Sequence, residues 1–456
     1  MQEPSIDFRR AMSRRHFIRA AALTGAAPLV VPHLTLGQEK AAGKRLRVGF
    51  VGMGKQNGGL MRNFVRQPDV SVVAVCDVDT TRRENALKVV RDFYAEDGKA
   101  PDGWAGCEGY VDFRELIGRD DIDAVCIATP DHWHAIITLA ALRSGKDVYC
   151  EKPLTHNIYE AVEVIKAVDE NGRVLQTGSM QRSMKEFRVA CELVLNGHIG
   201  KVERVECSFG DPGIPCDLPE EEIEAGLDWN MWVGPAPMRP YNSILSPRGV
   251  HDHFPNWRNY REFGGGMVTD WGAHHLDIAQ WGLGMDASGP VEARPPAEKD
   301  AKRGATLVYG NGVTVTHGGG IGVHFFGTEG EVEVTRGRFH FVQKGETKAR
   351  FLSREDRVSL ESQLQKAEKE FLGEAPKIQL YRSDNHLRDF LTCVETRKKP
   401  ITHEGVGGRS AICCHLMNLA YYHGQTIKWD PAENAFAEGT GDPKWLTRDY
   451  RDPWKV

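Results

Sequence analysis

Two short segments, far apart in the chain, carry side chains suited to moving protons and hydride. One is Glu151-Lys152-Pro153, and the other, residues 270–277, reads Asp-Trp-Gly-Ala-His-His-Leu-Asp. A lysine ammonium holds and polarises a hydroxyl group, and an imidazole that titrates near neutral pH takes the hydroxyl proton as a hydride leaves the adjacent carbon. We therefore predict that Lys152 and His274 carry out an alcohol oxidation, with Asp270 as a third catalytic residue.

The spacing of the second segment brings its polar residues together. On a helix, Asp270 and His274 are one turn apart, and Asp277 lies a further turn along the same face. Residues on one face of a helix can line the same pocket. The alternative is a structural role for His274 with His275 as the catalytic group, but the one-turn relation to Asp270 favours His274.

A sequence pattern typical of a nucleotide-binding domain comes before these two segments in the chain. Residues 45–51 are rich in β-forming side chains and run into a glycine-rich turn and an apolar-periodic stretch, the pattern of strand, turn and helix. Glycines let the backbone approach a pyrophosphate, which the helix N-terminus holds. We expect Gly52, Gly54, Gln56 and Asn57 to contact the cofactor. Asn57 replaces the third glycine of G-x-G-x-x-G, so the turn is one residue longer or the asparagine adopts a glycine-like conformation.

A second expected strand, residues 70–76, ends at Asp77, which lies 23 residues after Gly54. At this spacing a carboxylate accepts hydrogen bonds from the ribose of NAD and repels the extra phosphate of NADP. NAD is therefore the expected cofactor. Arg82 and Arg83 follow and are able to pair with a phosphate, so NADP stays as the less favoured alternative.

Further strands are expected at residues 124–128 and 147–150, each preceded by helix-like sequence. This alternation predicts a doubly wound parallel sheet, in which ligands bind beyond the carboxyl ends of the strands. The residues at those ends that we expect to contact the cofactor are Thr129, Pro130, His134, Glu151 and Lys152.

Together these motifs resemble the Gfo/Idh/MocA oxidoreductase family. That family combines an N-terminal Rossmann domain with Glu-Lys-Pro after a late strand and Asp-x-Gly-x-His-x-x-Asp in a second domain. The last pattern is present here as Asp270, Gly272, His274 and Asp277, and a Gly327-Thr328-Glu329-Gly330 turn also fits. The resemblance extends from about Leu46 to near the C-terminus.

The resemblance implies an α/β fold with two domains. Residues 44–180 would form the Rossmann NAD-binding domain, and residues 181–456 an α+β domain with a large, mostly antiparallel open sheet. That sheet often serves oligomerisation in the family, which implies a homo-oligomer, either a dimer or a tetramer. The resemblance also assigns Lys152 and His274 as the catalytic pair and Asp270 as a substrate ligand or charge partner.

The N-terminus carries an expected export signal. Residues 13–19 read Ser-Arg-Arg-His-Phe-Ile-Arg, and the apolar stretch from Ala20 to Val31 is far shorter than the ~20 residues of a membrane span. We interpret residues 1–40 as a twin-arginine signal and linker, which predicts an exported, periplasmic protein without stable membrane insertion. The alternative is an ordinary basic N-terminus. Because twin-arginine substrates are exported folded, a tightly bound NAD is expected. A redox-neutral reaction, which regenerates the bound NAD in each cycle, would suit such a protein.

Composition excludes other classes of function. With 456 residues and 41% hydrophobic side chains, the chain is long enough for two sizeable cores. Lys plus Arg (58) falls below Asp plus Glu (63), and no basic block follows the signal, which argues against nucleic-acid binding. The ten cysteines contain no C-x-x-C, and export would permit a disulfide of open pairing among Cys107, Cys191, Cys207 and Cys216.

The middle of the chain is a candidate sugar-recognition region. Residues 228–258 are rich in aromatic, amide and basic groups, which stack on sugar rings and satisfy hydroxyls, although packing at the domain interface explains them equally well. The histidine pairs 132/134, 251/253 and 274/275 lack a further ligand at a recognisable spacing, so no metal is predicted. The expected substrate-binding residues are Arg182, Trp257, Arg258, His253, Asp270 and His274.

These patterns predict an NAD-dependent oxidoreductase that acts on a secondary hydroxyl of a sugar, glycoside or cyclic polyol. Two alternatives stay open. One is a redox-neutral NAD-dependent glycosidase, although the glycosidases of the resembled family lack the lysine of Glu-Lys-Pro. The other is a non-catalytic sugar-binding protein on the same fold, since fold alone does not determine function.

Overall fold

Six strands of the N-terminal part form a parallel sheet. The computed structural model describes residues 45–96, 99–320 and 322–456. The sheet has the order β3-β2-β1-β4-β5-β6. Its central strands are buried along nearly their whole length, as expected for a sheet covered on both faces. The strands are β1 (Leu46–Val51), β2 (Val70–Cys76), β3 (Glu108–Tyr110), β4 (Ala124–Ile127), β5 (Asp147–Cys150) and β6 (Leu175–Thr177).

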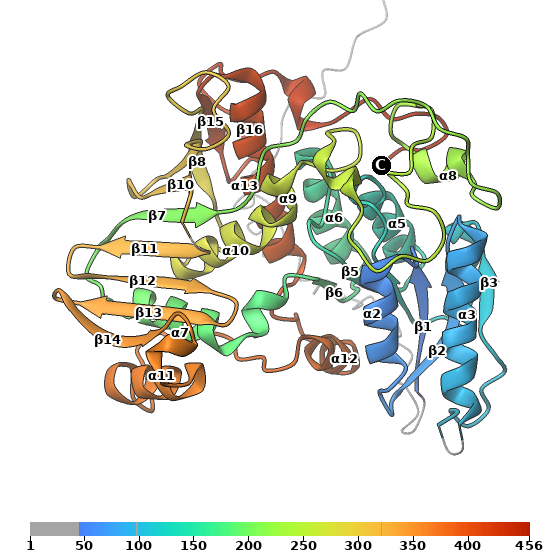
Figure 1. The fold of residues 1–456 in the computed structure, drawn as a ribbon, viewed down its shortest axis with the longest axis horizontal. Helices are drawn as coiled ribbons and strands as arrows, with labels where there is room; N and C mark the ends of the chain where they lie inside the picture. The colour runs from blue at the N-terminus through green and yellow to red at the C-terminus, as the bar shows by residue number, and fades with distance from the viewer. Residues whose placement is uncertain (1–44, 97–98, 321) are drawn as a thin grey trace, which may run out of the picture. The chain divides into compact units, whose positions relative to one another are not determined.

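Helices connect these strands, so the predicted doubly wound parallel sheet is confirmed (Figure 1). Several begin at a side chain that accepts a backbone N–H of the first turn, as Asp79 does for Arg82 and Asn157 does for Glu160. The helices are α2 (Lys55–Phe64), α3 (Thr80–Ala95), α4 (Phe113–Ile117), α5 (Asp131–Arg143) and α6 (Ile158–Asn171).

The second sheet has ten strands in the order β14-β13-β12-β11-β7-β10-β9-β8-β15-β16. All neighbouring pairs are antiparallel except β7 with β10, which confirms the large, mostly antiparallel sheet. Burial alternates along β12 and β13, so one face packs against the core. The strands are β7 (Val202–Ser208), β8 (Pro290–Arg294), β9 (Thr306–Tyr309), β10 (Thr314–Gly318), β11 (Val323–Gly327), β12 (Gly330–Thr335), β13 (Arg338–Gln343), β14 (Glu346–Phe351), β15 (Ile427–Asp430) and β16 (Ala435–Phe436).

Helices cover one face of this sheet and lie between the two sheets (Figure 1). The C-terminal helices also contact the nucleotide part, because α13 packs along α6 and Phe390 of α12 packs on Phe64 and Tyr149. The longer helices are α7 (Lys185–Leu195), α10 (Gly272–Gly282), α11 (Leu360–Ala367), α12 (His386–Thr396) and α13 (Glu404–His423). The short ones are η1 (Met180–Ser183), α8 (Trp229–Val233), η2 (Asn256–Asn259), α9 (Met267–Asp270), η3 (Arg354–Asp356), η4 (Glu368–Leu372) and η5 (Pro443–Leu446).

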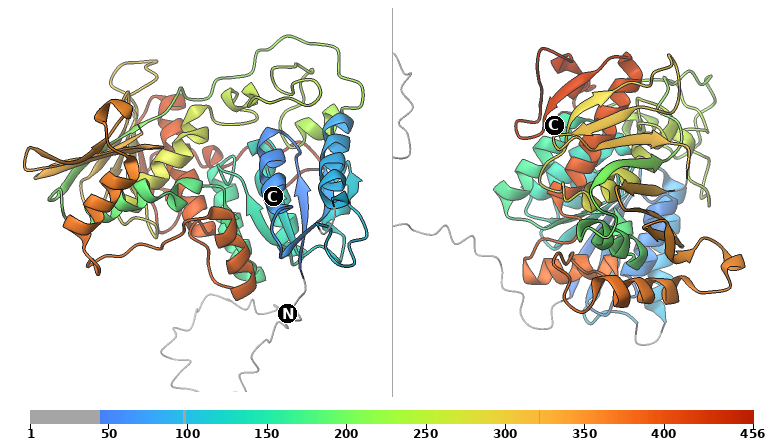
Figure 2. Two further views of the ribbon diagram at one scale, coloured as in Figure 1. Left: turned by 60° about the horizontal axis from the view of Figure 1, so that its bottom comes forward. Right: turned by 90° about the vertical axis from the view of Figure 1, so that its left-hand side faces the viewer.

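A long segment between β7 and α9 passes over to the carboxyl end of the parallel sheet (Figures 1 and 2). We call residues 226–258 of it the crossing loop. The backbone N–H of Asp228 donates to Val78 O at 3.0 Å, and the N–H of Thr80 donates to Gly226 O at 3.0 Å. Within the loop Trp229 stacks on Trp232 at 4.6 Å. These tryptophans of the expected sugar-recognition region therefore pack a small core of their own.

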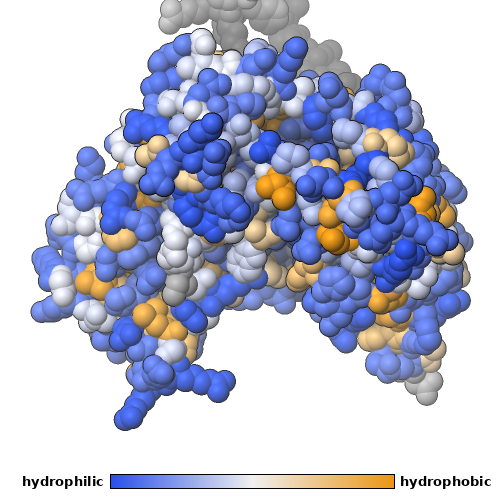
Figure 3. All heavy atoms as spheres, turned by 45° about the horizontal axis from the view of Figure 1, so that its top comes forward, coloured by the Kyte–Doolittle hydropathy of each residue, from blue (hydrophilic) through white to orange (hydrophobic). Residues whose placement is uncertain are grey.

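The surface in Figure 3 is mainly hydrophilic, with apolar residues in small groups. Among the described residues, no helix combines the length and the apolar character needed to cross a membrane. All ten cysteines carry free thiols, so the permitted disulfide is not formed. The expected export signal lies in residues 1–44, outside the described residues.

Candidate functional site

The glycine turn after β1 forms a cradle for an anion. Gly52 has φ +82°, and a Cβ there would lie within 2.9 Å of the Thr129 backbone, so only glycine fits this close approach. Gly54 is the N-cap of α2 and provides no side-chain acceptor for the first-turn N–H groups. Unpaired N–H groups at a helix N-terminus suit a pyrophosphate. The turn and helix therefore fit a dinucleotide cofactor.

Asn57 does not belong to this cradle. It lies within α2 with helical backbone geometry, is fully buried, and its Nδ2 donates to Val51 O at 3.0 Å. The side chain joins the helix to the end of β1. Both expectations for Asn57, a lengthened turn and a glycine-like conformation, are thus wrong, and its place is structural rather than in contact with the cofactor.

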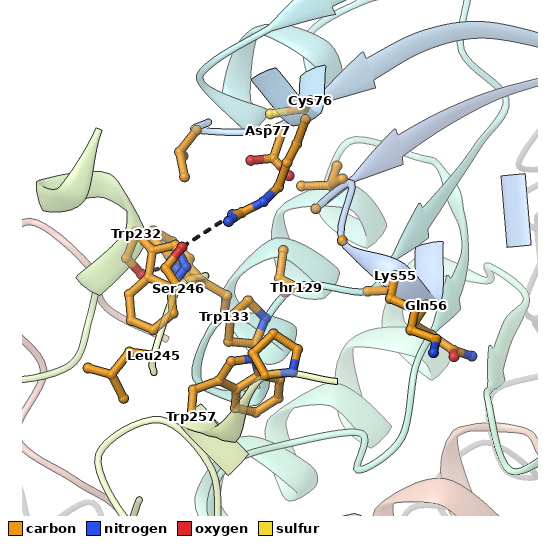
Figure 4. A pocket seen from close by; sticks show the side chains of 18 of the residues that line it. Lys55, Gln56, Cys76, Asp77, Thr129, Trp133, Trp232, Leu245, Ser246 and Trp257 are labelled. Atoms are coloured by element: carbon orange, nitrogen blue, oxygen red, sulfur yellow. Dashed lines mark hydrogen bonds between the residues drawn. The ribbon is translucent and has the colours of Figure 1, made fainter. Parts of the chain in front are cut away.

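Asp77 lies across the cradle at the end of β2 (Figure 4). Its Oδ2 accepts the Met53 N–H at 2.6 Å, and its Oδ1 accepts the Asp79 N–H at 2.8 Å. Burial raises the pKa of this carboxyl. The side chain lines a cavity together with Gly52 and Gly54. We call this space the cofactor cavity.

The arginines after Asp77 have other partners. Arg82 is buried and donates to Ser246 Oγ at 3.2 Å, to Gly249 O at 3.2 Å and to Pro247 O, all in the crossing loop. Arg83 donates to Asp77 O at 2.8 Å. Neither guanidinium is therefore free to receive a ribose phosphate without giving up these bonds.

The crossing loop forms the opposite wall of the cofactor cavity. Trp232, Leu245, Ser246 and Trp257 face the space from this side, as Figure 4 shows. Lys55 of α2 also reaches the loop, because its Nζ donates to Asp252 O at 2.8 Å. The cavity is thus enclosed by the parallel sheet on one side and by the crossing loop on the other.

A second, more polar space adjoins the cofactor cavity, and we call it the polar cavity. Lys152, just beyond β5, donates from Nζ to Asp270 Oδ1 at 2.5 Å and to Asp270 O at 3.0 Å. Arg258 Nε lies 3.5 Å from the same Oδ1. Burial alone would raise the pKa of Asp270, but the charges of Lys152 and Arg258 outweigh it and hold the pKa below its usual value.

Glu151 lines the polar cavity and bonds to Gln56, which lines both cavities. Its Oε1 accepts from Gln56 Nε2 at 2.7 Å, and its Oε2 accepts from the Lys152 N–H at 3.2 Å. Gly178 packs against this carboxylate so closely that a Cβ there would lie 2.5 Å from Oε2. Burial raises the pKa of Glu151. The contacts fix the end of β5 and thereby the start of the Lys152 side chain.

His274 lies in the first turn of α10 and lines the polar cavity with Asp270, the last residue of α9. Its Nε2 accepts from Arg336 Nη2 at 3.0 Å, which places the imidazole proton on Nδ1, a buried atom that has no hydrogen-bond partner among the described residues. Burial, followed by the charges of Lys152 and Arg336, lowers the pKa of His274 well below its usual value. The imidazole is therefore neutral and suited to accept a proton.

Asp277 and Arg182 lie deeper than the polar cavity. The Arg182 guanidinium is buried and pairs with Asp277 Oδ1 at 2.8 Å and with Asp286 Oδ2 at 2.7 Å. Asp277 also accepts from Ser410 Oγ at 2.8 Å. Asp277 therefore does not share a pocket with His274, and the structure removes Arg182 from the expected substrate-binding set.

The remaining expected site residues divide into two groups. Thr129, Pro130 and Trp257 line the cofactor cavity. His134 is buried and lines the polar cavity, with Nδ1 2.7 Å from Pro153 O and Nε2 3.0 Å from Thr129 O. His253 is exposed and lines neither cavity, so it is not placed to bind substrate.

The described residues include no group of three His, Cys, Asp or Glu side chains arranged to hold a metal ion.

Arg336 is the site residue that the sequence did not indicate. It lies in the turn between β12 and β13 and lines the polar cavity over the ring of Trp271, at 4.8 Å. A Thr-Arg-Gly-Arg turn is typical of a solvated hairpin end. No local signal distinguishes it, because only the packing of the second sheet brings it to His274.

A Rossmann sheet whose cofactor cavity opens on a lysine and a neutral histidine defines a class, the oxidoreductases that use a nicotinamide cofactor. Residues 46–179 match the model of the Gfo/Idh/MocA oxidoreductase family, NAD-binding Rossmann fold, and residues 209–456 match the family's C-terminal alpha/beta domain. The chain belongs to the Gfo/Idh/MocA oxidoreductase family.

Curated relatives carry two kinds of name. A protein of Shewanella pealeana named glycosyl hydrolase family 109 protein is 28% identical over 215 residues, which cover 43% of this chain and 46% of the relative. The inositol 2-dehydrogenase of Salmonella typhimurium is 34% identical over 158 residues, which cover 34% of this chain and 43% of the relative. The chain thus spans less than half the length of these curated relatives.

Solved structures share the fold over most of the chain. The aldose-aldose oxidoreductase of Caulobacter crescentus, complexed with glycerol, has a TM-score of 0.56 and 19% identity, and the match covers 84% of this chain and 100% of that one. A levoglucosan dehydrogenase in complex with NADH has a TM-score of 0.55 and 17% identity, covering 84% and 99%. At these identities the likeness establishes the fold.

Proposed function

We propose that this protein is an NAD-dependent oxidoreductase that oxidises a secondary hydroxyl of a sugar, glycoside or cyclic polyol. The observation that carries the proposal is the 2.5 Å contact of Lys152 Nζ with Asp270, in the same cavity as His274. That cavity adjoins the cofactor cavity and shares Thr129 and Trp257 with it. A substrate carbon and a nicotinamide would meet at this junction.

The residues divide the chemistry as follows. Asp270 holds the Lys152 ammonium, which binds the substrate hydroxyl oxygen and stabilises negative charge on it. His274, neutral in this environment, takes the hydroxyl proton on Nε2. Bound NAD supplies the acceptor for the hydride that leaves the same carbon. The substrate loses two hydrogens in total, one as a proton and one as a hydride.

NAD is the cofactor that we propose, and we propose that it is held tightly. Asp77 lines the part of the cofactor cavity in which we expect the ribose, and the nearby Arg82 and Arg83 are bonded to other groups. The crossing loop encloses the cavity through Arg82 and Lys55. Mass spectrometry of the purified native protein, before and after denaturation, tests this proposal. Protein purified without stoichiometric NAD would refute tight binding.

A panel of sugars, glycosides and polyols tests the reaction. Purified protein is incubated with each compound, and bound-cofactor absorbance and product masses are followed together. A product lighter by two hydrogens, formed with reduced cofactor, supports the dehydrogenase. The matched variant Lys152→Ala should form this product about 10²–10⁴-fold more slowly. Saturable binding without any reaction across the panel would refute the enzyme and favour a sugar-binding protein.

A redox-neutral glycosidase is the second candidate, and the glycosyl hydrolase names among the relatives favour it. The enzyme would oxidise the sugar, eliminate the aglycone and return the hydride. Release of aglycone without net NADH in the same assay would establish this reaction. Lys152 supports net dehydrogenation instead, since the glycosidases of the family lack this lysine.

We further propose export by the twin-arginine pathway and assembly into a dimer or tetramer. The support for export is the motif around Arg14 and Arg15, which lies outside the described residues. The support for assembly is the large open sheet of the family's second domain. Light scattering of the purified protein measures the assembly, and a monomeric mass would refute it.

A further inference from the structure

Arg336 brings a positive charge into the polar cavity from the second sheet. It occupies the β12–β13 turn, where Gly337 has φ +72°. The Gly337 N–H donates to Glu186 Oε1 at 3.0 Å, which ties the turn to α7. This bond holds the turn in place, and the exposed Arg336 side chain extends from it over Trp271 at the rim of the polar cavity.

The neighbours of Arg336 are neutral. Its Nη2 donates to His274 Nε2 at 3.0 Å, its guanidinium covers the Trp271 ring, and its Nε donates to the Gln181 amide oxygen at 3.2 Å in the amide orientation that satisfies both side chains. Among the described residues no carboxylate lies within 4.0 Å of it. A guanidinium is always charged and favours planar, bidentate anions.

The carboxylates of Glu151, Asp270 and Glu186 act on Arg336 only from more than 4.0 Å away, and those of the cavity have other partners. Lys152 and Arg258 share the single carboxylate of Asp270. Glu151 is bonded to Gln56 and to the Lys152 N–H. Asp131, at the same cavity, is buried, and burial raises the pKa of its carboxyl well above its usual value. Of the three cations that line the polar cavity, Arg336 is the one without a carboxylate within 4.0 Å among the described residues.

We propose that the substrate is an acidic sugar whose carboxylate binds Arg336, and that this contact frees Nε2 of His274 to take the hydroxyl proton. The inference rests on the proposed function. A charge-assisted, bidentate contact to a carboxylate is stronger than a hydrogen bond to a neutral imidazole, so the anion displaces His274 as the partner of Arg336. The carboxylate is unchanged in the reaction, in which the hydroxyl carbon loses a hydride and the hydroxyl loses its proton to His274.

Matched ligands and variants test this proposal on the purified holoprotein. Calorimetry measures the affinity for each ligand. Glucuronate is compared with its uncharged methyl ester and with glucose, and galacturonate is compared with galactose. Both acids are also compared with a glucose phosphate. The parent should bind a uronate about 10- to 100-fold tighter than the ester. Arg336→Gln should lose this preference, and Arg336→Lys should keep part of it. Arg338→Gln, at the exposed first residue of β13 and outside both cavities, is the control and should behave as the parent.

Equal affinity for acid and ester, a preference that survives Arg336→Gln, or no binding of any acid would each overturn the proposal. Tighter binding of the sugar phosphate than of either uronate would replace the carboxylate with a phosphate. The test is separate from that of the reaction. Hydride transfer from neutral sugars at the same efficiency refutes the charge preference alone, whereas uronate binding without oxidation refutes the enzyme and leaves the preference standing.

Discussion

Replacing Asp77 separates its contribution to folding from its contribution to cofactor choice. Its two carboxylate oxygens accept the Met53 N–H at 2.6 Å and the Asp79 N–H at 2.8 Å, and the side chain is only 7% exposed. Asp77→Ala removes both acceptors. Asp77→Asn keeps one amide oxygen and thus one of the two bonds, while it removes the negative charge.

The size of the effect follows from these bonds. Leaving a buried donor unsatisfied costs about 1–3 kcal/mol, so Asp77→Ala should lose about 2–6 kcal/mol of unfolding free energy and Asp77→Asn about 1–3 kcal/mol. Met53 lies within the glycine turn, so both variants should also bind NAD more weakly. Because the charge that repels a ribose phosphate is gone, the ratio of NAD to NADP affinity should fall by about tenfold, equivalent to ~1.4 kcal/mol.

Urea unfolding of the cofactor-stripped protein and titration with both nucleotides measure the two effects. Asn385→Ala is the matched control, since Asn385 caps α12 by accepting the Arg388 N–H and lines neither cavity. It should lose about 1 kcal/mol of stability without a change in the nucleotide ratio. An unchanged urea midpoint for Asp77→Ala would refute the energetic reasoning, and a parent protein that already prefers NADP would refute the assignment of Asp77 to the ribose.

Three further predictions concern catalysis, pH and export. Lys152→Ala and His274→Ala should each slow single-turnover hydride transfer about 10²–10⁴-fold while NAD binding stays intact. The double variant should be little slower than either single variant. Normal hydride transfer in His274→Ala would indicate that His275 is the base instead. Because the pKa of His274 is lowered well below 6.5, the neutral base persists as the pH falls through 6.5, so stopped-flow rates should show no inflection there, and an apparent pKa near 6.5 would contradict this. Replacing Arg14 and Arg15 with lysine should retain the protein in the cytoplasm on cell fractionation, and unchanged export would rule out the twin-arginine signal.

The nucleotide side of the molecule was predictable because its signals are local. The four central strands, β2, β1, β4 and β5, are apolar runs that end in a turn or a polar residue, and each pattern is contained within its own segment. The short edge strands β3 (Glu-Gly-Tyr) and β6 (Leu-Gln-Thr) carry no such pattern and were not predicted. Gly52 and Gly54 follow β1 directly, and Lys152 follows β5, so their positions at the carboxyl edge were deduced without knowledge of distant contacts. The antiparallel sheet came from the family resemblance, since periodicity alone did not indicate it.

The errors arose where partners lie far away in the sequence. Arg182 seemed available for substrate, but its carboxylate partners stand 95 and 104 positions further along the chain. Asn57 matched a glycine position, yet its side chain bonds to β1 and packs against β4. Sequence spacing specifies the elements that carry such residues, but the burial and pairing of a side chain depend on which other elements pack against it.

The same distinction bears on substrate choice. Much of the cofactor cavity is formed by short motifs, each contained in a few consecutive residues. The charge of the polar cavity depends instead on Arg258 from the η2 turn and on Arg336 from a hairpin of the second sheet. Changes in those distant turns alter the substrate side without disturbing the glycine turn or Lys152. Two chains that share the nucleotide motifs can therefore differ in substrate, and relatives named as glycosyl hydrolases and as inositol dehydrogenases are consistent with such a division. In this chain, substrate charge should accordingly depend on Arg336 of the β12–β13 turn.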